Sequence, residues 1–349
     1  MIQSNRARQW FPLVAVLAIL VGIVACYTDS NGVGTARVSI LEIGSGKIRR
    51  FANVTSRGFA GAPIWSPDGK TLTYMANIAE DNSFEIYTTN INTRDTITLA
   101  APQNLPITPQ YFGDLEWLPD SKHLLYRLSN NNISNIYVMN PDGSNPVETL
   151  MGRIGIFNLS PDGTRIAYSR ISYGDDRSKD KIYVTVLDSD TPVEIVAELG
   201  RIDELQWSPD GSRIAFIAYQ FGHYRLYTTE ANGNNLNELT NSQEFQRDID
   251  WSPDGTRIAY WMENPGRVTT DLHTINSDGS DDQLLAKFTE DVHCSNWSPK
   301  GDLILFGTST GSNKLYTVNP EDGSETILFT GSWCASWLPD GNYIAFFDY

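Results

Sequence analysis

The sequence is poor in the residues that build metal centres and disulfide scaffolds. It contains three cysteines and four histidines among 349 residues, which excludes a zinc site of four thiolates and a fold held by many disulfides. We therefore expect no metal and no cofactor. Basic residues are also scarce, because 26 Lys and Arg face 42 Asp and Glu, and the formal net charge is −16. A nucleic-acid surface needs the opposite sign of charge, so we expect no nucleic acid partner.

Long apolar runs are missing as well, apart from one near the start of the chain. Residues 1–10 carry Arg6 and Arg8, residues 11–25 are apolar throughout, and Cys26 follows. A membrane-spanning helix needs about 20 apolar residues, and this run is shorter. A basic start, a short apolar stretch and small residues at its end are typical of a secretory signal peptide, with an uncleaved short anchor as the alternative.

The four residues Ile23-Val24-Ala25-Cys26 resemble the lipobox of bacterial lipoproteins. The resemblance implies that residues 1–25 are a signal peptide, that Cys26 is lipidated, and that residues 26–35 are the lipidated end and a short polar tether. Acyl chains hold a protein on a membrane surface without spanning it. We therefore expect an extracytoplasmic protein, lipid-anchored to a bacterial membrane on its periplasmic or cell-surface side.

One short segment recurs seven times along the rest of the chain. In it, a strand-like stretch ends on a large apolar residue and the turn sequence S-P-D-G or a close variant follows, as in LQWSPDGSRIAFIA at 205–218. Successive copies are 40 to 52 residues apart, which is the length of a four-stranded propeller blade. The large apolar residues, called anchors below, are Trp65, Trp117, Leu159, Trp207, Trp251, Trp297 and Trp337.

The residues between two anchors predict the remaining strands of one blade. S-P-D-G reverses the chain after the first strand, because Pro fixes φ and Gly accepts positive φ. A second strand such as 257–260 follows, then a third such as 226–230 and, after a D-G-S turn, a fourth such as 326–329. Residues 36–51 look like the second half of such a unit. We predict an all-β protein: a seven-bladed β-propeller of four-stranded antiparallel blades over residues 36–349, with N-terminal strands closing the last blade.

The consensus W-S-P-D-G-x-x-I-A-[YF], followed by I-Y-x-x-[ND]-x-D-G, resembles the WD40-like propeller repeat of TolB and its relatives. The resemblance covers about residues 36–349, with Leu159, Ser121 and Lys300 as departures, and implies a propeller that binds other proteins. TolB itself carries an α/β domain before a six-bladed ring, and residues 27–35 are too few for such a domain. We expect the anchor tryptophans to pack between neighbouring blades.

The strand that precedes each anchor is expected to line the central channel. Acidic residues recur one or three positions before the anchor, at Asp114, Glu116, Glu204, Asp248 and Asp250. Four positions before their anchors, nearer the mouth, lie Arg247, His293 and Trp333. This pattern predicts a polar, partly acidic funnel that attracts a cationic peptide, an amine or a metal ion. The alternative is a water-filled channel whose acids pair with arginines of adjacent blades.

Residues 307–311 read G-T-S-T-G and match the nucleophile motif G-x-S-x-G. That motif needs a strand before it and a helix after it. Here the flanking residues predict two strands of one blade. We therefore interpret the segment as a loop and assign no catalytic residue.

Cys294 and Cys334 stand at the same offset, three residues before successive anchors. The oxidising compartment that a signal peptide implies permits a disulfide between them. However, equivalent positions on successive blades are expected to point the same way round the ring, and disulfide geometry is strict. We therefore expect two buried thiols.

These observations together predict a non-enzymatic binding or scaffold lipoprotein of the bacterial cell envelope. We expect a monomeric propeller whose partner is an envelope protein or peptide, bound on the face that carries the loops before each inner strand. Two alternatives stay open. One is a propeller hydrolase or lyase acting on polysaccharide or peptide, and the other is a lipoprotein that binds a small molecule such as an amine or a sugar.

Overall fold

The computed structural model describes residues 34–56, 58–77, 84–99, 111–130, 133–171, 179–187, 189, 191–264, 269–309 and 313–348. The expected signal peptide, the expected lipidation site Cys26 and the tether up to residue 33 lie outside the described residues.

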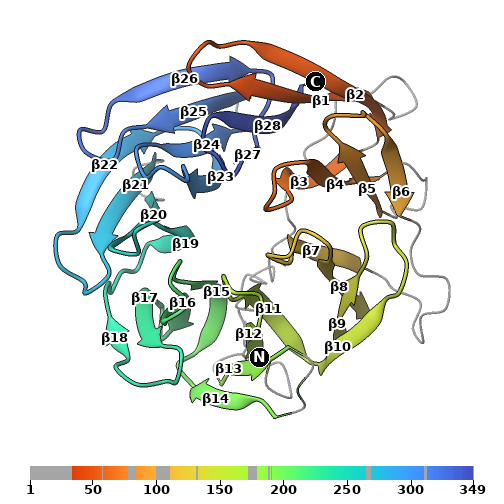
Figure 1. Ribbon diagram of the computed structural model, residues 1–349. Helices are drawn as coiled ribbons and strands as arrows, with labels where there is room; N and C mark the ends of the chain where they lie inside the picture. The colour runs from red at the N-terminus through yellow and green to blue at the C-terminus, as the bar shows by residue number, and fades with distance from the viewer. Residues whose placement is uncertain are drawn as a thin grey trace, which may run out of the picture.

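The described strands form seven four-stranded antiparallel sheets that are arranged in a ring (Figure 1). Each sheet is one blade, and its strands follow one another from the centre of the ring outward. The predicted all-β, seven-bladed propeller is therefore confirmed. Within the described part of the chain, no helix is long and apolar enough to cross a membrane.

Blades are numbered here by the order of their inner strands. Blade 1 contains β3 (Gly58–Trp65), β4 (Thr71–Asn77), β5 (Phe84–Asn90) and β6 (Thr96–Leu99). Blade 2 contains β7 (Tyr111–Trp117), β8 (Leu124–Asn130), β9 (Ile133–Met139) and β10 (Val147–Gly152). Blade 3 contains β11 (Ile154–Leu159), β12 (Arg165–Arg170), β13 (Lys181–Val186) and β14 (Val193–Val196). Blade 4 contains β15 (Arg201–Trp207), β16 (Arg213–Gln220), β17 (His223–Glu230) and β18 (Asn237–Glu238). Blade 5 contains β19 (Phe245–Trp251), β20 (Arg257–Asn264), β21 (Thr269–Asn276) and β22 (Gln283–Phe288). Blade 6 contains β23 (Val292–Trp297), β24 (Ile304–Thr308), β25 (Lys314–Val318) and β26 (Glu325–Thr330). Blade 7 contains β27 (Ala335–Trp337), β28 (Tyr343–Asp348), β1 (Gly34–Glu42) and β2 (Ile48–Ser56).

Blade 7 closes the ring by pairing the two ends of the described chain. β1 runs antiparallel to β28, with Val38 opposite Phe347. The Arg50 guanidinium of β2 also donates to the Asp348 carboxylate at 3.0 Å. This pairing covers a strand edge that is otherwise a template for aggregation. The predicted closure by N-terminal strands is confirmed.

The S-P-D-G turns are stabilised by their own side chains. In blade 4, Ser208 Oγ donates to Asp210 Oδ1 at 2.6 Å, and Gly211 has a φ of +66°. The Ser208 hydroxyl is the largest cause that lowers the pKa of Asp210 to about 2. In blade 2, Ser121 takes the glycine position with a φ of +56°, and its Oγ accepts a hydrogen bond from the Asp68 backbone N–H of blade 1 at 3.0 Å. The turn that departs from the repeat therefore also joins two blades.

The described residues form seven hydrophobic core clusters, one between each pair of neighbouring blades, and each contains one anchor. At the boundary of blades 3 and 4, Trp207 is 4% exposed and packs against Ile182 of blade 3 and Ile214 of its own blade. The Arg165 guanidinium of blade 3 lies over the same indole, 4.6 Å from the ring centroid. Packing between blades therefore depends on the anchors.

The two cysteines form a disulfide between blade 6 and blade 7, so the expectation of two free thiols is wrong. Their Cα atoms are 5.5 Å apart, inside the roughly 4.4–6.8 Å range of disulfides. The physical reason is a β-bulge in β23 between His293 and Asn296, where Cys294 takes a left-handed φ of +56°. Cys334, by contrast, precedes β27. Because the two residues have different backbone conformations, equal sequence offsets do not make their side chains point the same way.

Candidate functional site

The inner strands carry β-bulges, which change the direction of their side chains. In β19 the register shifts between Arg247 and Asp250, and Asp248 has a φ of +54°. Comparable shifts occur in β3, β7, β11, β15 and β23. The residues just before each anchor are therefore directed partly toward the neighbouring blade.

One position before the anchor, a side-chain oxygen accepts the backbone N–H of the next blade's anchor. The four donor–acceptor pairs are Leu159 N to Glu116 Oε2 at 3.2 Å, Trp207 N to Asn158 Oδ1 at 2.9 Å, Trp251 N to Gln206 Oε1 at 3.1 Å and Trp297 N to Asp250 Oδ2 at 2.5 Å. Blades 2 to 6 are joined in series by this bond. Two of the predicted site carboxylates, Glu116 and Asp250, therefore hold blades together.

Glu204 makes a related contact three positions before the anchor of blade 4. Its two carboxylate oxygens accept the backbone N–H groups of Asp248 and Ile249 in blade 5 at 2.6 and 2.8 Å. Burial, followed by the charge of Asp248, raises the pKa of Glu204. Burial also raises the pKa of Asp250 to about 6. These inner carboxylates therefore keep protons to a higher pH than ordinary surface acids.

Arg247 is the cation beside these carboxylates. Its Nε donates to Glu263 Oε1 at 2.7 Å, and its Nη1 donates to Asp248 Oδ2 and to the Val292 carbonyl of blade 6, each at 2.7 Å. Its side chain is 14% exposed. The guanidinium is thus held in one position by partners from two blades.

His293 and Trp333 continue this group into blades 6 and 7. His293 Nε2 lies 2.8 Å from Ser309 Oγ, and its ring meets the Trp333 indole edge-on with 5.5 Å between centroids. Burial, followed by the charge of Arg247, lowers the pKa of His293. This shift favours the neutral form of the imidazole.

The structure brings together most of the residues that the sequence predicted for the mouth. We call Glu204, Arg247, Asp248, His293 and Ser309 the inner cluster, and Trp333 lies beside it. Glu204, Arg247, Asp248 and His293 come from the inner strands β15, β19 and β23, which surround the centre of the ring (Figure 1), and Ser309 directly follows β24. The side chain of Asp114, whose backbone lies in β7, is outside the described residues.

Two members of this environment were missed by sequence reasoning. Ser309 was noticed only as part of G-x-S-x-G, and residues 310–312 of that segment lie outside the described residues. Its contact with His293 arises because β23 pairs with β24, with His293 opposite Gly307. Glu263, near the end of β20, lies just beyond the repeated segment, so the comparison of repeats did not select it. Across the ranges that the structure describes, no group of three or more His, Cys, Asp and Glu side chains is placed to hold a metal ion.

Comparison with known proteins yields several propellers of similar architecture. The "putative TolB" from Agrobacterium tumefaciens has 19% identity and a TM-score of 0.54, and the match covers 90% of this chain and 98% of that chain. An oligogalacturonate lyase in complex with manganese has 15% identity and a TM-score of 0.64, with 82% of this chain and 87% of that chain covered. The β-propeller domain of the Trilobed protease from Pyrococcus furiosus has 16% identity and a TM-score of 0.62, with 84% and 89% covered.

At such identities the likeness to these structures shows the fold alone. The match to a protein family is more specific. The model of the TolB beta propeller domain matches residues 116–333, which is more than half of the chain. The chain therefore belongs to the TolB beta propeller domain family.

Proposed function

We propose that this protein is a lipid-anchored binding or scaffold protein of the bacterial cell envelope, and that its partner docks on the inner cluster. Two observations support the location. Residues 1–26 have the pattern of a lipoprotein signal, and Cys294 is bonded to Cys334. Disulfides persist in oxidising, extracytoplasmic compartments and are rare in the cytosol.

The observation that carries a binding function, rather than acid–base catalysis, is the engagement of Glu204. Both of its carboxylate oxygens accept backbone N–H groups of blade 5, from Asp248 and Ile249. A general acid or base must come within hydrogen-bond distance of the proton that it transfers. A carboxylate occupied by two backbone amides instead stabilises the ring and fixes the backbone at Asp248 and Ile249.

The charge around the inner cluster favours a partner with a basic segment. Arg247 is shared by two carboxylates, Asp248 and Glu263, whose side chains are 31% and 42% exposed. The whole chain carries a formal charge of −16. A negative surface potential steers cationic partners toward it. An envelope protein or peptide rich in Lys or Arg is therefore the partner class that fits.

Site-specific photo-cross-linking in native membranes tests this proposal. One photo-reactive residue replaces Asp291, which is exposed and immediately precedes β23, and the other replaces Asp322, which is exposed in the turn between β25 and β26. We expect a cross-linked protein from position 291 and none from position 322. No product from position 291 contradicts the proposed docking surface.

The charge requirement is tested by Asp248→Asn in the cross-linking protein. Asparagine tolerates the φ of +54° at this position, so the variant removes charge without straining the bulge. Asp281→Asn is the matched control, because Asp281 is exposed and has a φ of +55°. We expect Asp248→Asn to lose the cross-linked product and Asp281→Asn to keep it. Equal yields from the two variants contradict a role for the Asp248 charge.

A second candidate function, hydrolysis, is favoured by the Ser309–His293 pair. The 2.8 Å between Ser309 Oγ and His293 Nε2 is a distance at which imidazole accepts the proton of a nucleophilic serine. The lowered pKa of His293 favours the neutral, basic form of its imidazole. Labelling by a fluorophosphonate that disappears in Ser309→Ala favours this candidate. A protein that is not labelled excludes it.

A further inference from the structure

Blade 5 departs from the repeat at a position where five other blades agree. In those five blades the third strand carries a tyrosine opposite an aromatic residue of the second strand, and these tyrosines are Tyr87, Tyr137, Tyr183, Tyr227 and Tyr316. In blade 5 the same place, opposite Tyr260, is taken by His273. The shorter imidazole ring reaches less far toward the outer strand than a tyrosine does.

The partner of this tyrosine is missing from blade 5 as well. The tyrosine hydroxyl donates to a glutamate of the fourth strand in three blades, from Tyr137 to Glu148 at 3.0 Å, from Tyr183 to Glu194 at 3.0 Å and from Tyr227 to Glu238 at 3.1 Å. In blade 5 the residue opposite His273 on the fourth strand is Leu284. Blade 5 has therefore lost both ends of this hydrogen bond.

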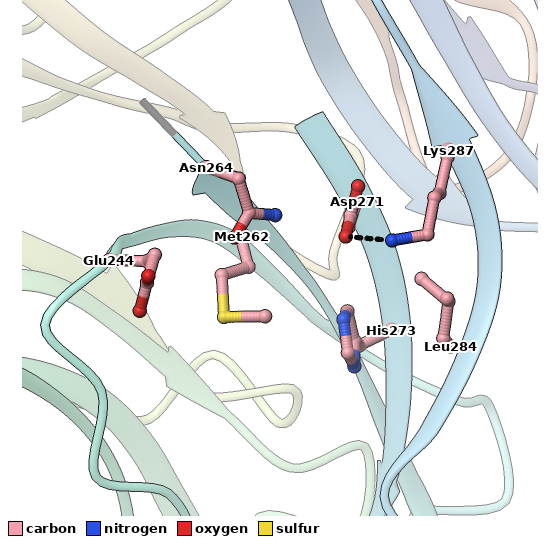
Figure 2. Close-up of a pocket in the computed structure, with 7 residues that line it drawn as sticks. All are labelled: Glu244, Met262, Asn264, Asp271, His273, Leu284 and Lys287. Carbon is pink, nitrogen blue, oxygen red and sulfur yellow. Dashed lines mark hydrogen bonds and ion pairs between the residues drawn. The ribbon is translucent and has the colours of Figure 1, made fainter. Parts of the chain in front are cut away.

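A cavity of about 540 Å³ lies where these two side chains differ from the repeat (Figure 2). Met262, Asp271 and Lys287 lie opposite one another across β20, β21 and β22 and form one wall. Glu244 comes from the connection between blades 4 and 5, and Asn264 from the end of β20. The volume falls within the roughly 300–1,000 Å³ of small-molecule sites. The cavity is on the outer half of blade 5, whereas the inner cluster uses the inner strand β19.

Three polar atoms around this cavity have no hydrogen-bond partner among the described residues. They are Asp271 Oδ1, His273 Nε2 and Asn264 Nδ2. The Asp271 side chain is only 5% exposed, and its other oxygen accepts the Lys287 ammonium at 2.8 Å. Unpaired buried polar groups cost stability, and here three of them lie around one cavity.

The unpaired atoms define the chemistry of a ligand. His273 Nδ1 lies 3.1 Å from Asp282 Oδ1, so Nδ1 carries the hydrogen of this contact, and Nε2 is an acceptor in the neutral imidazole and a donor in the imidazolium. Asp271 Oδ1 is an acceptor too, whereas Asn264 Nδ2 is a donor. A hydroxyl group both donates and accepts, so a ligand with several hydroxyls satisfies all three atoms.

The charge of the cavity disfavours an anionic ligand. The Asp271 carboxylate is paired with Lys287, whereas the Ser242 hydroxyl that donates to Glu244 at 2.8 Å does not neutralise that carboxylate, so the lining keeps one net negative charge. Hydroxyl groups pair with the three unpaired atoms without bringing a second charge into the cavity. The side chain of Lys287 is 43% exposed, whereas the Asp271 side chain that it contacts is 5% exposed.

We propose that this cavity of blade 5 binds a neutral polyhydroxylated ligand, one or two sugar units of a saccharide. Hydroxyls of the sugar pair with Asp271, His273 and Asn264, while Met262 and the 45% exposed Leu284 contact its CH groups. The site is separate from the inner cluster, so this proposal stands or falls independently of the protein partner.

Isothermal titration calorimetry on the full chain tests this site with maltose, cellobiose, lactose and N,N′-diacetylchitobiose as probes. Leu284→Trp fills the cavity from an exposed position of the outer strand, and Ile327→Trp is the matched control. Ile327 is 55% exposed and lies opposite Tyr316 in blade 6, as Leu284 lies opposite His273 in blade 5. We expect saturable binding of at least one neutral disaccharide, at least tenfold weaker in Leu284→Trp and unchanged in Ile327→Trp.

Putrescine and digalacturonate are the charged probes in the same titrations. The proposal is overturned if no neutral disaccharide binds the wild-type chain, or if binding is the same in Leu284→Trp as in wild type. It is also overturned if putrescine alone or digalacturonate alone binds and this binding is weakened in Leu284→Trp, because the cavity then selects its ligand by charge. Circular dichroism of both tryptophan variants verifies that each is folded.

Discussion

The Asp250 carboxylate of blade 5 accepts the backbone N–H of Trp297 in blade 6 at 2.5 Å. Its other oxygen accepts the Gln206 side-chain amide of blade 4 at 2.8 Å. One carboxylate therefore joins three successive blades at the centre of the ring. Asp250 therefore has a structural role, whereas sequence reasoning placed it in a ligand-binding site.

Asp250→Ala is expected to destabilise the ring, because it leaves the Trp297 N–H and the Gln206 amide without their acceptor. The free energy of unfolding should fall by about 1–3 kcal/mol, which is the usual cost of an unsatisfied buried donor. Urea denaturation measures it. Asp281→Asn, on an exposed turn, is the control and should stay within about 0.5 kcal/mol of wild type. Equal losses in the two variants contradict the inter-blade role.

The raised pKa of Asp250 predicts a specific pH dependence of stability. The native pKa of about 6 lies above the ordinary value of 3.8, so between these values the native state binds more protons than the unfolded state. Stability from this group is therefore complete below about pH 4 and is lost as the pH rises through about 6. A shift of one pKa unit corresponds to about 1.4 kcal/mol of unfolding free energy. Because Asp250 is partly exposed, we expect its whole pKa shift to change the unfolding free energy by about 2 kcal/mol.

Asp250→Asn isolates this effect because asparagine does not titrate. The difference in unfolding free energy between wild type and Asp250→Asn should shrink by about 2 kcal/mol from pH 4 to pH 7. Urea denaturation at pH 4, 5, 6 and 7 measures the difference. Parallel stability curves for the two proteins would show that the native pKa of Asp250 is ordinary.

The Cys294–Cys334 bond should contribute strongly to the stability of the closed ring. It closes a loop with a sequence separation of 40 residues. In the chain-entropy account such a loop is worth about 4 kcal/mol. Cys294→Ser/Cys334→Ser should therefore unfold at a lower urea concentration, and reductant should shift wild type but not the double variant. Identical transitions of wild type with and without dithiothreitol contradict the prediction.

The fold was predictable because the repeated segment occurs seven times and each copy indicates one blade. Every anchor marks an inner strand, and residues 36–51 indicated that β1 and β2 complete blade 7. The side chains near the centre were less predictable because a β-bulge changes their direction without any marker in the sequence. Cys294 shows this directly, since its φ of +56° is what made the reasoning from equal offsets fail. Sequence reasoning gave His273 no role, because its meaning needed the register that places it opposite Leu284.

The anchor of blade 4 allows a graded test of packing between blades. Trp207 packs against blade 3 and donates from Nε1 to the Asn158 carbonyl at 3.0 Å. Trp207→Ala should cost about 3–5 kcal/mol of unfolding free energy. Trp207→Leu should cost clearly less, because blade 3 already accommodates a leucine, Leu159, at the same place in the repeat. Equal costs in chemical denaturation contradict a role based on packing volume.

A variant that restores the repeat in blade 5 separates stability from ligand binding. In blade 4, the ring of Tyr227 stacks on Phe216 at 5.2 Å and its hydroxyl donates to Glu238. His273→Tyr/Leu284→Glu rebuilds the same pair in blade 5 and places a phenol in the cavity. The double variant should gain about 1 kcal/mol over the sum of the two single variants, which is the net value of one hydrogen bond.

This gain is measured as the coupling energy of a double-mutant cycle in urea denaturation, with the two single variants as controls. A positive coupling together with loss of disaccharide binding shows that the two positions are the hydrogen-bonding pair of the repeat and that the cavity depends on their replacement. Functional sites commonly keep residues that lower stability, so this is the pattern expected if His273 and Leu284 were retained for binding. A coupling energy of zero means that blade 5 positions the two side chains differently from blade 4, and the argument from the repeat then fails.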